Sequence, residues 1–319
     1  MPQPALETQG LTKDYTVGFW LAKKRRSLDG LTMRVEPGEV FGLLGPNGAG
    51  KSTAIKLLLG LIFPTSGTAQ ILGRPVGDVR AHREIGYLPE QPYFYDYLTA
   101  HELLDYFARF FELPASERRA RVNLLLEKVG LASAGKLQLR KYSKGMLQRV
   151  GLAQALVNDP RLVILDEPMS GLDPIGRREV RDIILDLKAR GKTVLFSTHI
   201  LSDAEMLCDR VAVLAAGKLR GIGALAEIMD LKAQGMEILF ELPVERPEPA
   251  ELLRRATKTG DRYRIHSPEE GLFDVLGQLH AAGARILSVT PIKPTLEDYF
   301  LKLIGPEGAR AAAVEVFSK

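Results

Sequence analysis

The sequence has a single cysteine and no long apolar run. Cys208 has no second cysteine to pair with, so an intrachain disulfide and a cysteine metal cluster are both excluded. No apolar run reaches the length that spans a bilayer, and the N-terminus lacks the pattern of a signal peptide. We therefore expect a cytoplasmic chain whose contact with a membrane is peripheral.

Internal repeats and low-complexity segments are also lacking, and the composition is that of an ordinary globular protein. The 319 residues are 45% hydrophobic and 26% charged, enough for two domains or for one large domain with an appendage. The net charge of +4 suits an anionic lipid surface, a nucleic acid or solubility alone. The strongest basic cluster is Lys23-Lys-Arg-Arg26, after Phe19 and Trp20. It suits lipid headgroups or an acidic partner, although a solvated loop between strands is the simpler interpretation.

A glycine-rich segment carries the strongest chemical signal. It matches the pattern G-x-x-x-x-G-K-[ST], and it lies between the apolar run Val40–Leu44 and a segment with helical apolar spacing. Glycines let backbone N–H groups turn toward phosphate oxygens, and the N-terminus of the following helix favours the same anion. A glycine-rich turn that matches by chance would lack these flanking elements. The segment is Gly45, Pro46, Asn47, Gly48, Ala49, Gly50, Lys51, Ser52 and Thr53.

The pattern assigns two side chains of this loop to a nucleoside triphosphate. Lys51 reaches the outer phosphates, and the Ser52 hydroxyl binds Mg²⁺. Downstream, Asp166 and Glu167 end the apolar run 162–165, where they suit a magnesium ligand and a base that activates water. Acidic pairs at strand ends are common, so this signal is not specific by itself.

Two further segments have a structural and a functional interpretation. His199 follows the predicted strand 193–197 at the sheet edge where ligands bind, so it suits a hydrogen bond to the terminal phosphate, although most such histidines are ordinary loop residues. Ser143 and Gly145 precede an apolar helix and suit an anion site, although a serine there is more often a simple N-cap.

In their order along the chain, these motifs resemble those of the nucleotide-binding subunits of ATP-binding cassette (ABC) transporters. The resemblance covers about residues 6–221. It implies ATP and Mg²⁺ as cofactors and makes His199 the switch histidine. It also implies that Tyr15 stacks on adenine, although a half-buried strand aromatic is the alternative. Ser143 and Gly145 become the signature that completes the site of a second subunit, and Asp173 belongs to the inter-subunit loop.

Two departures from the family pattern affect this assignment. The signature is Tyr-Ser-Lys-Gly-Met at residues 142–146, where Leu-Ser-Gly-Gly-Gln is the commonest form. Its serine and second glycine are retained. In the loop that usually supplies a glutamine, register places Glu90 there with Gln91 one position later, so either residue is a candidate to sense Mg²⁺ and water.

The order of predicted elements gives the expected architecture. Strands alternating with helices predict an α/β fold with a mostly parallel sheet. With the resemblance, this becomes a P-loop NTPase core with an N-terminal antiparallel β subdomain of short strands. We expect an ABC ATPase domain over 1–222, with an inserted helical subdomain at about 98–159. We expect a small C-terminal α+β domain over 223–305, which aids dimerisation or only stabilises the chain. A flexible tail over 306–319 follows.

The resemblance implies an ATPase that drives a separate integral membrane permease by ATP-dependent dimerisation with a second, identical subunit. The segments 142–146, 169–178 and 295–300 are most similar to the type-2 exporter class, which implies export and a place on the inner face of the cell membrane. The alternatives are a soluble ABC ATPase acting on nucleic acid or ribosomes, and a phosphate-loop kinase. The first would show paired cassettes or a dense basic face, so no nucleic acid is expected. The second leaves the signature unexplained. The cargo is not encoded in these motifs.

Overall fold

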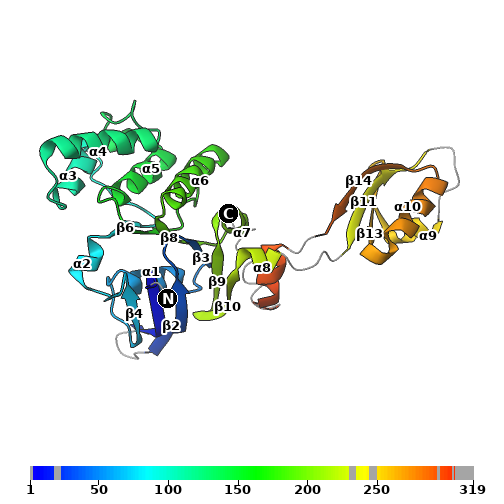
Figure 1. The fold of residues 1–319 in the computed structure, drawn as a ribbon, viewed down its shortest axis with the longest axis horizontal. Coiled ribbons are helices and arrows are strands. Elements are labelled where there is room, and N and C mark those ends of the chain that lie inside the picture. The colour runs from blue at the N-terminus through cyan, green and yellow to red at the C-terminus, as the bar shows by residue number, and fades with distance from the viewer. Residues whose placement is uncertain are drawn as a thin grey trace. The chain divides into compact units, whose positions relative to one another are not determined.

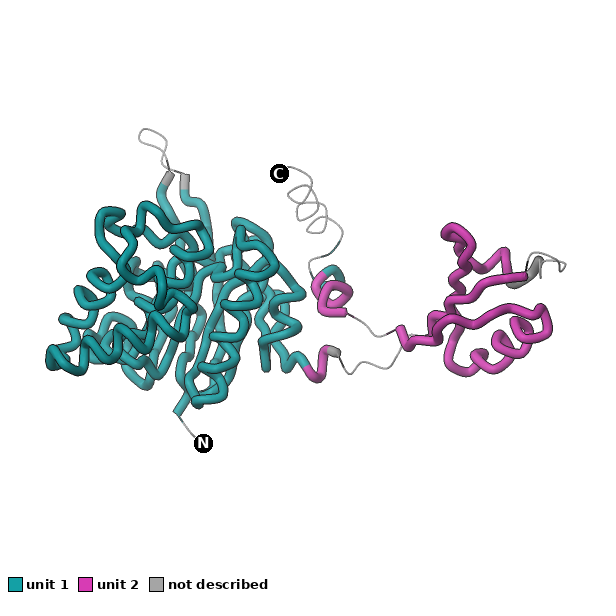
Figure 2. Tube along the Cα trace, turned by 90° about the horizontal axis from the view of Figure 1, so that it is seen from above, with its two compact units in different colours: residues 1–225, 301–319 teal, residues 226–300 magenta. Residues whose placement is uncertain are grey.

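The chain folds into the helices and strands drawn in Figure 1, and this computed structural model describes residues 3–17, 23–229, 235–243, 250–292, 295–303 and 305. Figure 2 shows its two compact units, one made of residues 1–225 with 301–319 and the other of residues 226–300. The domain boundaries expected at residues 222 and 305 stay predictions.

A six-stranded sheet organises the first unit, in the order β10-β9-β3-β8-β7-β6. All neighbours pair in parallel except β10, which is antiparallel to β9. Every residue of β3, β7 and β8 is buried, which explains why these strands are unbroken apolar runs in the sequence. The expected, mostly parallel sheet is confirmed. The strands are β3 (Val40–Leu44), β6 (Ile85–Leu88), β7 (Leu162–Asp166), β8 (Thr193–Thr198), β9 (Arg210–Ala215) and β10 (Lys218–Ala224).

A second sheet of the first unit is antiparallel, in the order β2-β1-β4-β5. Its strands are β1 (Leu6–Val17), β2 (Lys23–Val35), β4 (Ser66–Ile71) and β5 (Arg74–Pro75). β1 and β2 have 12 and 13 residues, so the expectation of short strands is wrong. The interpretation of residues 23–26 as a solvated loop is also wrong. They begin β2, because β1 pairs with them along their whole length.

Helix α1 (Lys51–Leu58) packs between these two sheets. Its Ile55 and Leu58 belong to one buried cluster with Leu31 of β2 and Ile164 of β7. Burial of such side chains stabilises the fold by about 1.5–3 kcal/mol each. Because the phosphate-binding loop leads directly into α1, this core fixes the position of the loop.

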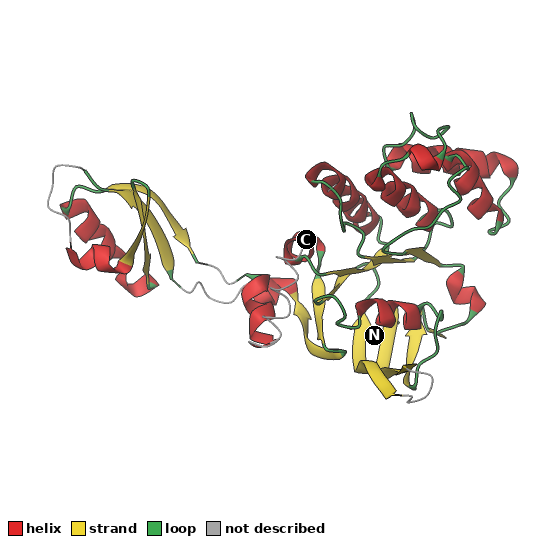
Figure 3. Ribbon diagram, turned by 180° about the vertical axis from the view of Figure 1, so that it is seen from behind, coloured by secondary structure: helices red, strands yellow, loops and turns green. Residues whose placement is uncertain are grey.

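Helices α3, α4 and α5 contact one another and form the inserted helical subdomain (Figure 3). Thr99 and Glu102 form a capping box at the start of α3, and Asp173 caps α6 with Pro174 in its first turn. The helices of the first unit that follow α1 are α2 (Val79–His82), α3 (Ala100–Arg109), α4 (Ala115–Lys128), α5 (Lys144–Ala155), α6 (Pro174–Ala189) and α7 (Leu201–Leu207). A 3-10 turn spans Leu139–Lys141, and α8 (Leu225–Met229) follows β10.

The second unit has the element order of a ferredoxin-like βαββαβ fold. Its antiparallel sheet has the order β12-β13-β11-β14, and α10 packs on one face of it through Val275 and Leu279. The elements are β11 (Met236–Glu241), α9 (Ala250–Arg255), β12 (Ala256–Thr259), β13 (Arg262–Ser267), α10 (Leu272–Ala281) and β14 (Arg285–Pro291). The small α+β domain is confirmed as a fold, whereas α9 and β12 were not expected from the sequence.

The segment Ser267-Pro268-Glu269-Glu270 predicts a capping box at the start of a helix, and this prediction is wrong. Ser267 does not cap a helix, because its hydroxyl donates to the carbonyl oxygen of Pro268, and residues Glu269–Gly271 form a 3-10 turn before α10. Residues 296–303 are helical, as expected. Three predicted features lie outside the described residues. They are the tail 306–319, the end at Leu231 of a helix predicted to connect the two domains, and the aromatic pair Phe19 and Trp20.

Candidate active site

The phosphate-binding loop joins β3 to α1 and has a backbone that requires glycine. Gly48 and Gly50 have φ angles of 74° and 106°, in the left-handed region that strains other residues. A Cβ on Gly50 would also lie 2.7 Å from the carbonyl oxygen of Ser27 in β2. The loop is therefore packed against β2, and it ends at a helix N-terminus, where an anion is favoured.

The Lys51 side chain is held inside this loop and is only 5% exposed. Its Nζ donates to the carbonyl oxygens of Gly45 at 2.6 Å and Pro46 at 3.2 Å. The same ammonium forms an ion pair with Glu167 Oε1 at 3.0 Å. A fixed cation thus lies where the loop, β7 and α1 meet.

The acidic residues lie at the carboxyl end of β7, beside the end of its parallel neighbour β8. Ser197 of β8 links them, because its hydroxyl donates to Asp166 Oδ1 at 2.6 Å and accepts from the Glu167 backbone N–H at 2.9 Å. Ser52 Oγ lies 3.3 Å from the same Asp166 oxygen. The hydroxyl of the loop and the carboxylate of the strand therefore converge on one point.

Glu167 is buried and is bound on both of its carboxylate oxygens. His199 Nδ1 lies 2.8 Å from Oε2, and Lys51 binds Oε1. Burial by itself raises the pKa of Glu167, but the hydrogen bond from His199 and the charge of Lys51 outweigh it, and the pKa is lowered. The carboxylate is therefore ionised at neutral pH.

A cavity of about 890 Å³ contains most of the predicted nucleotide residues. It is lined by Tyr15, Thr16, Arg25, Arg26, Ser27, Pro46, Asn47, Gly48, Ala49, Gly50, Lys51, Ser52, Thr53, Glu90, Glu167, Ala216 and Gly217. Tyr15 is 37% exposed, and Lys13 Nζ lies 5.3 Å from its ring centroid. Glu90 lines the cavity, whereas Gln91 is exposed outside its lining. An elongated ligand with a flat end and an anionic end fits these walls.

Three residues predicted to act on a second subunit do not line this cavity. Ser143 is the exposed N-cap of α5, where its hydroxyl accepts from the Met146 N–H at 3.3 Å. Asp173 is the exposed N-cap of α6 and accepts from the Gly176 N–H at 2.8 Å. Gly145 lies near Leu172, so the two helix starts are neighbours. The structure thus brings these two segments to one another, and none of the three residues lines the cavity.

Sequence reasoning missed two residues of the site. Ser197 was visible only as the end of a buried apolar strand, and a serine there is unusual enough to have been a signal. Arg25 was visible only as part of a basic cluster. Its position in the cavity depends on the pairing of β1 with β2, which the sequence does not specify.

The fold and the site together define a class of protein. A phosphate-binding loop between a buried parallel strand and a helix, with carboxylates at the end of a neighbouring strand, is the arrangement of P-loop nucleoside triphosphatases. The ABC transporter family model matches residues 28–170. The chain belongs to the family of ABC transporter ATP-binding proteins, and it is an ATP-binding ATPase subunit of an ABC transporter.

Comparisons with individual proteins agree with this membership. An uncharacterized ABC transporter ATP-binding protein of Synechocystis is 47% identical over 307 residues, which is 95% of this chain and 85% of that protein. A Nod factor export ATP-binding protein I of Burkholderia thailandensis is 37% identical over 287 residues, 88% of this chain and 92% of that protein. The ATP-binding cassette MJ0796, solved as a post-hydrolysis dimer with ADP and Pi, matches with a TM-score of 0.64 and 26% identity. That match covers 69% of this chain and 98% of the cassette. Among the described residues no helix is long and apolar enough to cross a membrane.

Replacing Ser197 with alanine is expected to weaken both stability and catalysis. The Asp166 carboxylate loses a donor and the buried Glu167 N–H loses its acceptor, so the free energy of unfolding should fall by about 1–3 kcal/mol. Urea denaturation and steady-state ATP hydrolysis measure the two effects. Ser202→Ala, at an exposed position of α7, is the control and should change neither. Equal stability and rate in Ser197→Ala and wild type would contradict the linking role of this hydroxyl.

Proposed function

We propose that this chain hydrolyses ATP at a site shared by two identical subunits and thereby drives an exporter. One observation carries the proposal. Most of the phosphate-binding loop lines a single cavity with Tyr15, Glu90 and Glu167, whereas Ser143, Gly145 and Asp173 do not line it. The first group binds and cleaves ATP, and the second completes the site of a partner subunit.

In this proposal Lys51 binds the outer phosphates and Glu167 is the general base. A triphosphate in the loop gives Lys51 new anionic partners, which compete with Glu167 for the ammonium. The ionised Glu167 carboxylate is then free to accept a proton from the attacking water. His199, which hydrogen-bonds Glu167, orients that carboxylate and donates to the terminal phosphate.

We assign Mg²⁺ to Ser52 and Asp166. Their oxygen atoms lie 3.3 Å apart at one edge of the site, and hydroxyl and carboxylate oxygens are the ligands that this hard cation prefers. When bound, the metal offsets negative charge on the phosphoryl group being transferred. Of the two candidates for sensing Mg²⁺ and water, we favour Glu90, because it lines the cavity and Gln91 does not.

Tyr15 is assigned to the adenine base. Its ring is partly exposed at the wall of the cavity, and a flat aromatic surface there suits stacking on a base.

The dimer follows from the position of the second group of residues. Ser143 uses its oxygen as an acceptor within α5, so its O–H stays available to donate to a phosphate on another subunit. The N-terminus of α5 favours the same anion. The dimeric MJ0796 cassette with ADP and Pi supports such an assembly.

The cellular location and the direction of transport are assigned from the family. Relatives named as ABC transporter and Nod factor export ATP-binding proteins support transport over work on nucleic acid, and they support outward transport. We therefore propose that the subunit lies at the cytoplasmic face of the cell membrane and binds an integral membrane permease. The second unit then supports dimerisation or stability.

Glu167→Gln is expected to abolish hydrolysis while retaining ATP binding. An amide cannot accept the proton from water, so the rate should fall by about 10²–10⁴-fold. ATP should then stabilise a dimer, which light scattering under saturating ATP and Mg²⁺ detects. Glu127→Gln, at an exposed position of α4, is the matched control. An unchanged rate would contradict the assignment of the base, and a monomer would contradict the shared site.

Glu90→Ala is expected to raise the Mg²⁺ concentration needed for half-maximal hydrolysis by about tenfold, because it removes an orienting group near the metal. Gln91→Ala should leave this concentration unchanged, since that residue does not line the cavity. Magnesium titrations at fixed ATP compare the two variants. The reverse pattern would assign the role to Gln91.

Mixing Lys51→Ala with Ser143→Arg subunits is expected to restore hydrolysis. Each variant alone has two defective sites, but a mixed dimer has one intact site made from both chains. Random exchange in a symmetric dimer predicts about one quarter of the wild-type rate. Mixing wild type with Lys51→Ala shows whether a single intact site is active. If it is, and mixed variants still form inactive dimers, Ser143 does not act across the interface.

A further inference from the structure

Strand β2 passes alongside the cavity and presents one of its faces to the phosphate-binding loop. Ser27 marks this face, because its hydroxyl lies 2.8 Å from the hydroxyl of Thr53 in α1. Arg25 lies two residues farther along the strand, about 7 Å from Ser27. Arg25 also pairs directly with Tyr15 across the sheet and lines the cavity.

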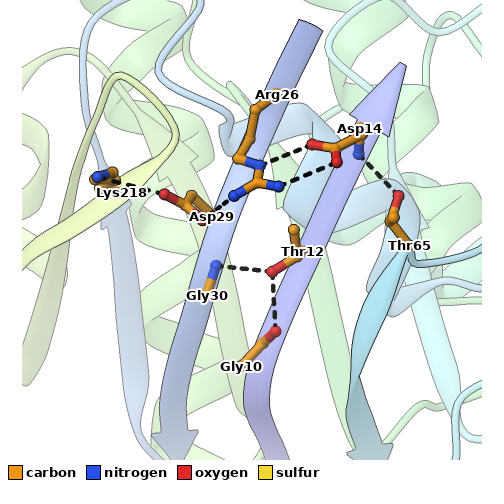
Figure 4. Close-up of polar contacts among 8 residues, drawn as sticks. All are labelled: Gly10, Thr12, Asp14, Arg26, Asp29, Gly30, Thr65 and Lys218. Carbon is orange, nitrogen blue, oxygen red and sulfur yellow. Dashed lines mark hydrogen bonds and ion pairs between the residues drawn. The ribbon is translucent and has the colours of Figure 1, made fainter. Parts of the chain in front are cut away.

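The neighbouring Arg26 is held by two carboxylates. Figure 4 shows its guanidinium between Asp14 and Asp29, with Nε 2.8 Å from Asp14 Oδ1 and Nη1 2.9 Å from Asp29 Oδ1. Asp29 also forms an ion pair with Lys218 at 3.4 Å. The hydrogen bond from Arg26 lowers the pKa of Asp14 despite some desolvation, so this network is charged at neutral pH. Arg26 thus has its charge balanced within the sheet.

Arg25 differs from Arg26 in this respect. Within the described part of the chain, it forms no hydrogen bond and no ion pair, although it borders the cavity. A guanidinium presents a rigid, planar set of donors that binds a phosphate through two parallel hydrogen bonds. An uncompensated arginine beside a site for a polyanion therefore points to a ligand contact.

We propose that Arg25 binds the α-phosphate of the nucleotide and so connects the contact at Tyr15 with the contacts of the phosphate-binding loop. In a nucleotide, the α-phosphate lies between the nucleoside and the outer phosphates. On β2, Arg25 has a comparable intermediate place. It pairs with Tyr15 on one side, and it lies two residues from Ser27, which contacts α1 on the other side. The inference rests on the proposed nucleotide site and adds to it a residue outside the loop.

The test compares the binding of several ligands to Arg25→Ala by isothermal titration calorimetry. Dissociation constants for ATP, ADP, GTP and UTP should all rise by about five- to twentyfold, because each ligand has an α-phosphate and loses a charge-assisted contact. Pyrophosphate, which occupies only the loop, should bind as it does to the wild type. Arg25→Lys should recover part of the affinity.

Lys24→Ala is the matched control. It removes the same charge from the adjacent residue of β2, on the face opposite to Arg25, and Lys24 does not line the cavity. Its dissociation constants should stay within about twofold of wild type, since a screened surface charge contributes little.

Three outcomes would overturn the inference. They are unchanged nucleotide binding in Arg25→Ala, an equal loss in Lys24→Ala, and a loss for ATP without a loss for ADP. A loss confined to the purine nucleotides would mean that Arg25 stacks on the base instead. Failure of the nucleotide site itself is recognised separately, because Lys51→Ala would then bind ATP as tightly as wild type.

Discussion

The structure depends on an ion pair buried where three elements of the first unit meet. Lys51 and Glu167 are 5% and 6% exposed, and their charges are 3.0 Å apart. Removing either partner from such a pair leaves an uncompensated buried charge, at a cost of about 3–5 kcal/mol. The pair is therefore kept only while the loop after β3 and the turn after β7 stay in place. The sheet order β3-β8-β7 provides this constraint, and Ser197 of the intervening strand holds the end of β7.

This constraint explains which parts of the fold could be predicted from the sequence. Strands β3, β7 and β8 are buried on both faces, so they are visible as apolar runs, and α6 is visible from Asp173 and Pro174 at its start. The long strands β1 and β2 were underestimated because register shifts along their pairing interrupt the alternation that indicates a strand. Their basic start, residues 23–26, is a strand only because β1 pairs with it. The ferredoxin-like order of the second unit likewise depends on pairing between distant segments.

The site shows the same division between local and distant information. The phosphate-binding loop is one continuous segment, and the two carboxylates are adjacent residues. The chemistry of each could therefore be predicted from its own stretch of sequence. Ser197 and Arg25 are placed beside the site by neighbours on other strands, and nothing in their local sequence specifies those neighbours. Ser143 and Asp173 are a third case. Their role as N-caps is satisfied within the chain, so only the family resemblance, and no contact within one subunit, indicates what else they bind.

These three cases bear on how the subunits, in the proposed function, alternate between an associated and a separate state. The Glu167 carboxylate is held by Lys51 at the start of α1 and by His199 just after β8, and the groups proposed to act on a partner lie at exposed helix starts. Under the proposed function, a triphosphate interacts with both. Its terminal phosphate then supplies the free-energy difference between associated and separate subunits, because a ligand shifts an equilibrium only by its differential affinity for the two states. Under the same proposal, contacts at the nucleoside end, such as those of Tyr15 and Arg25, would be present before and after cleavage. They retain the nucleotide without opposing the separation of the subunits.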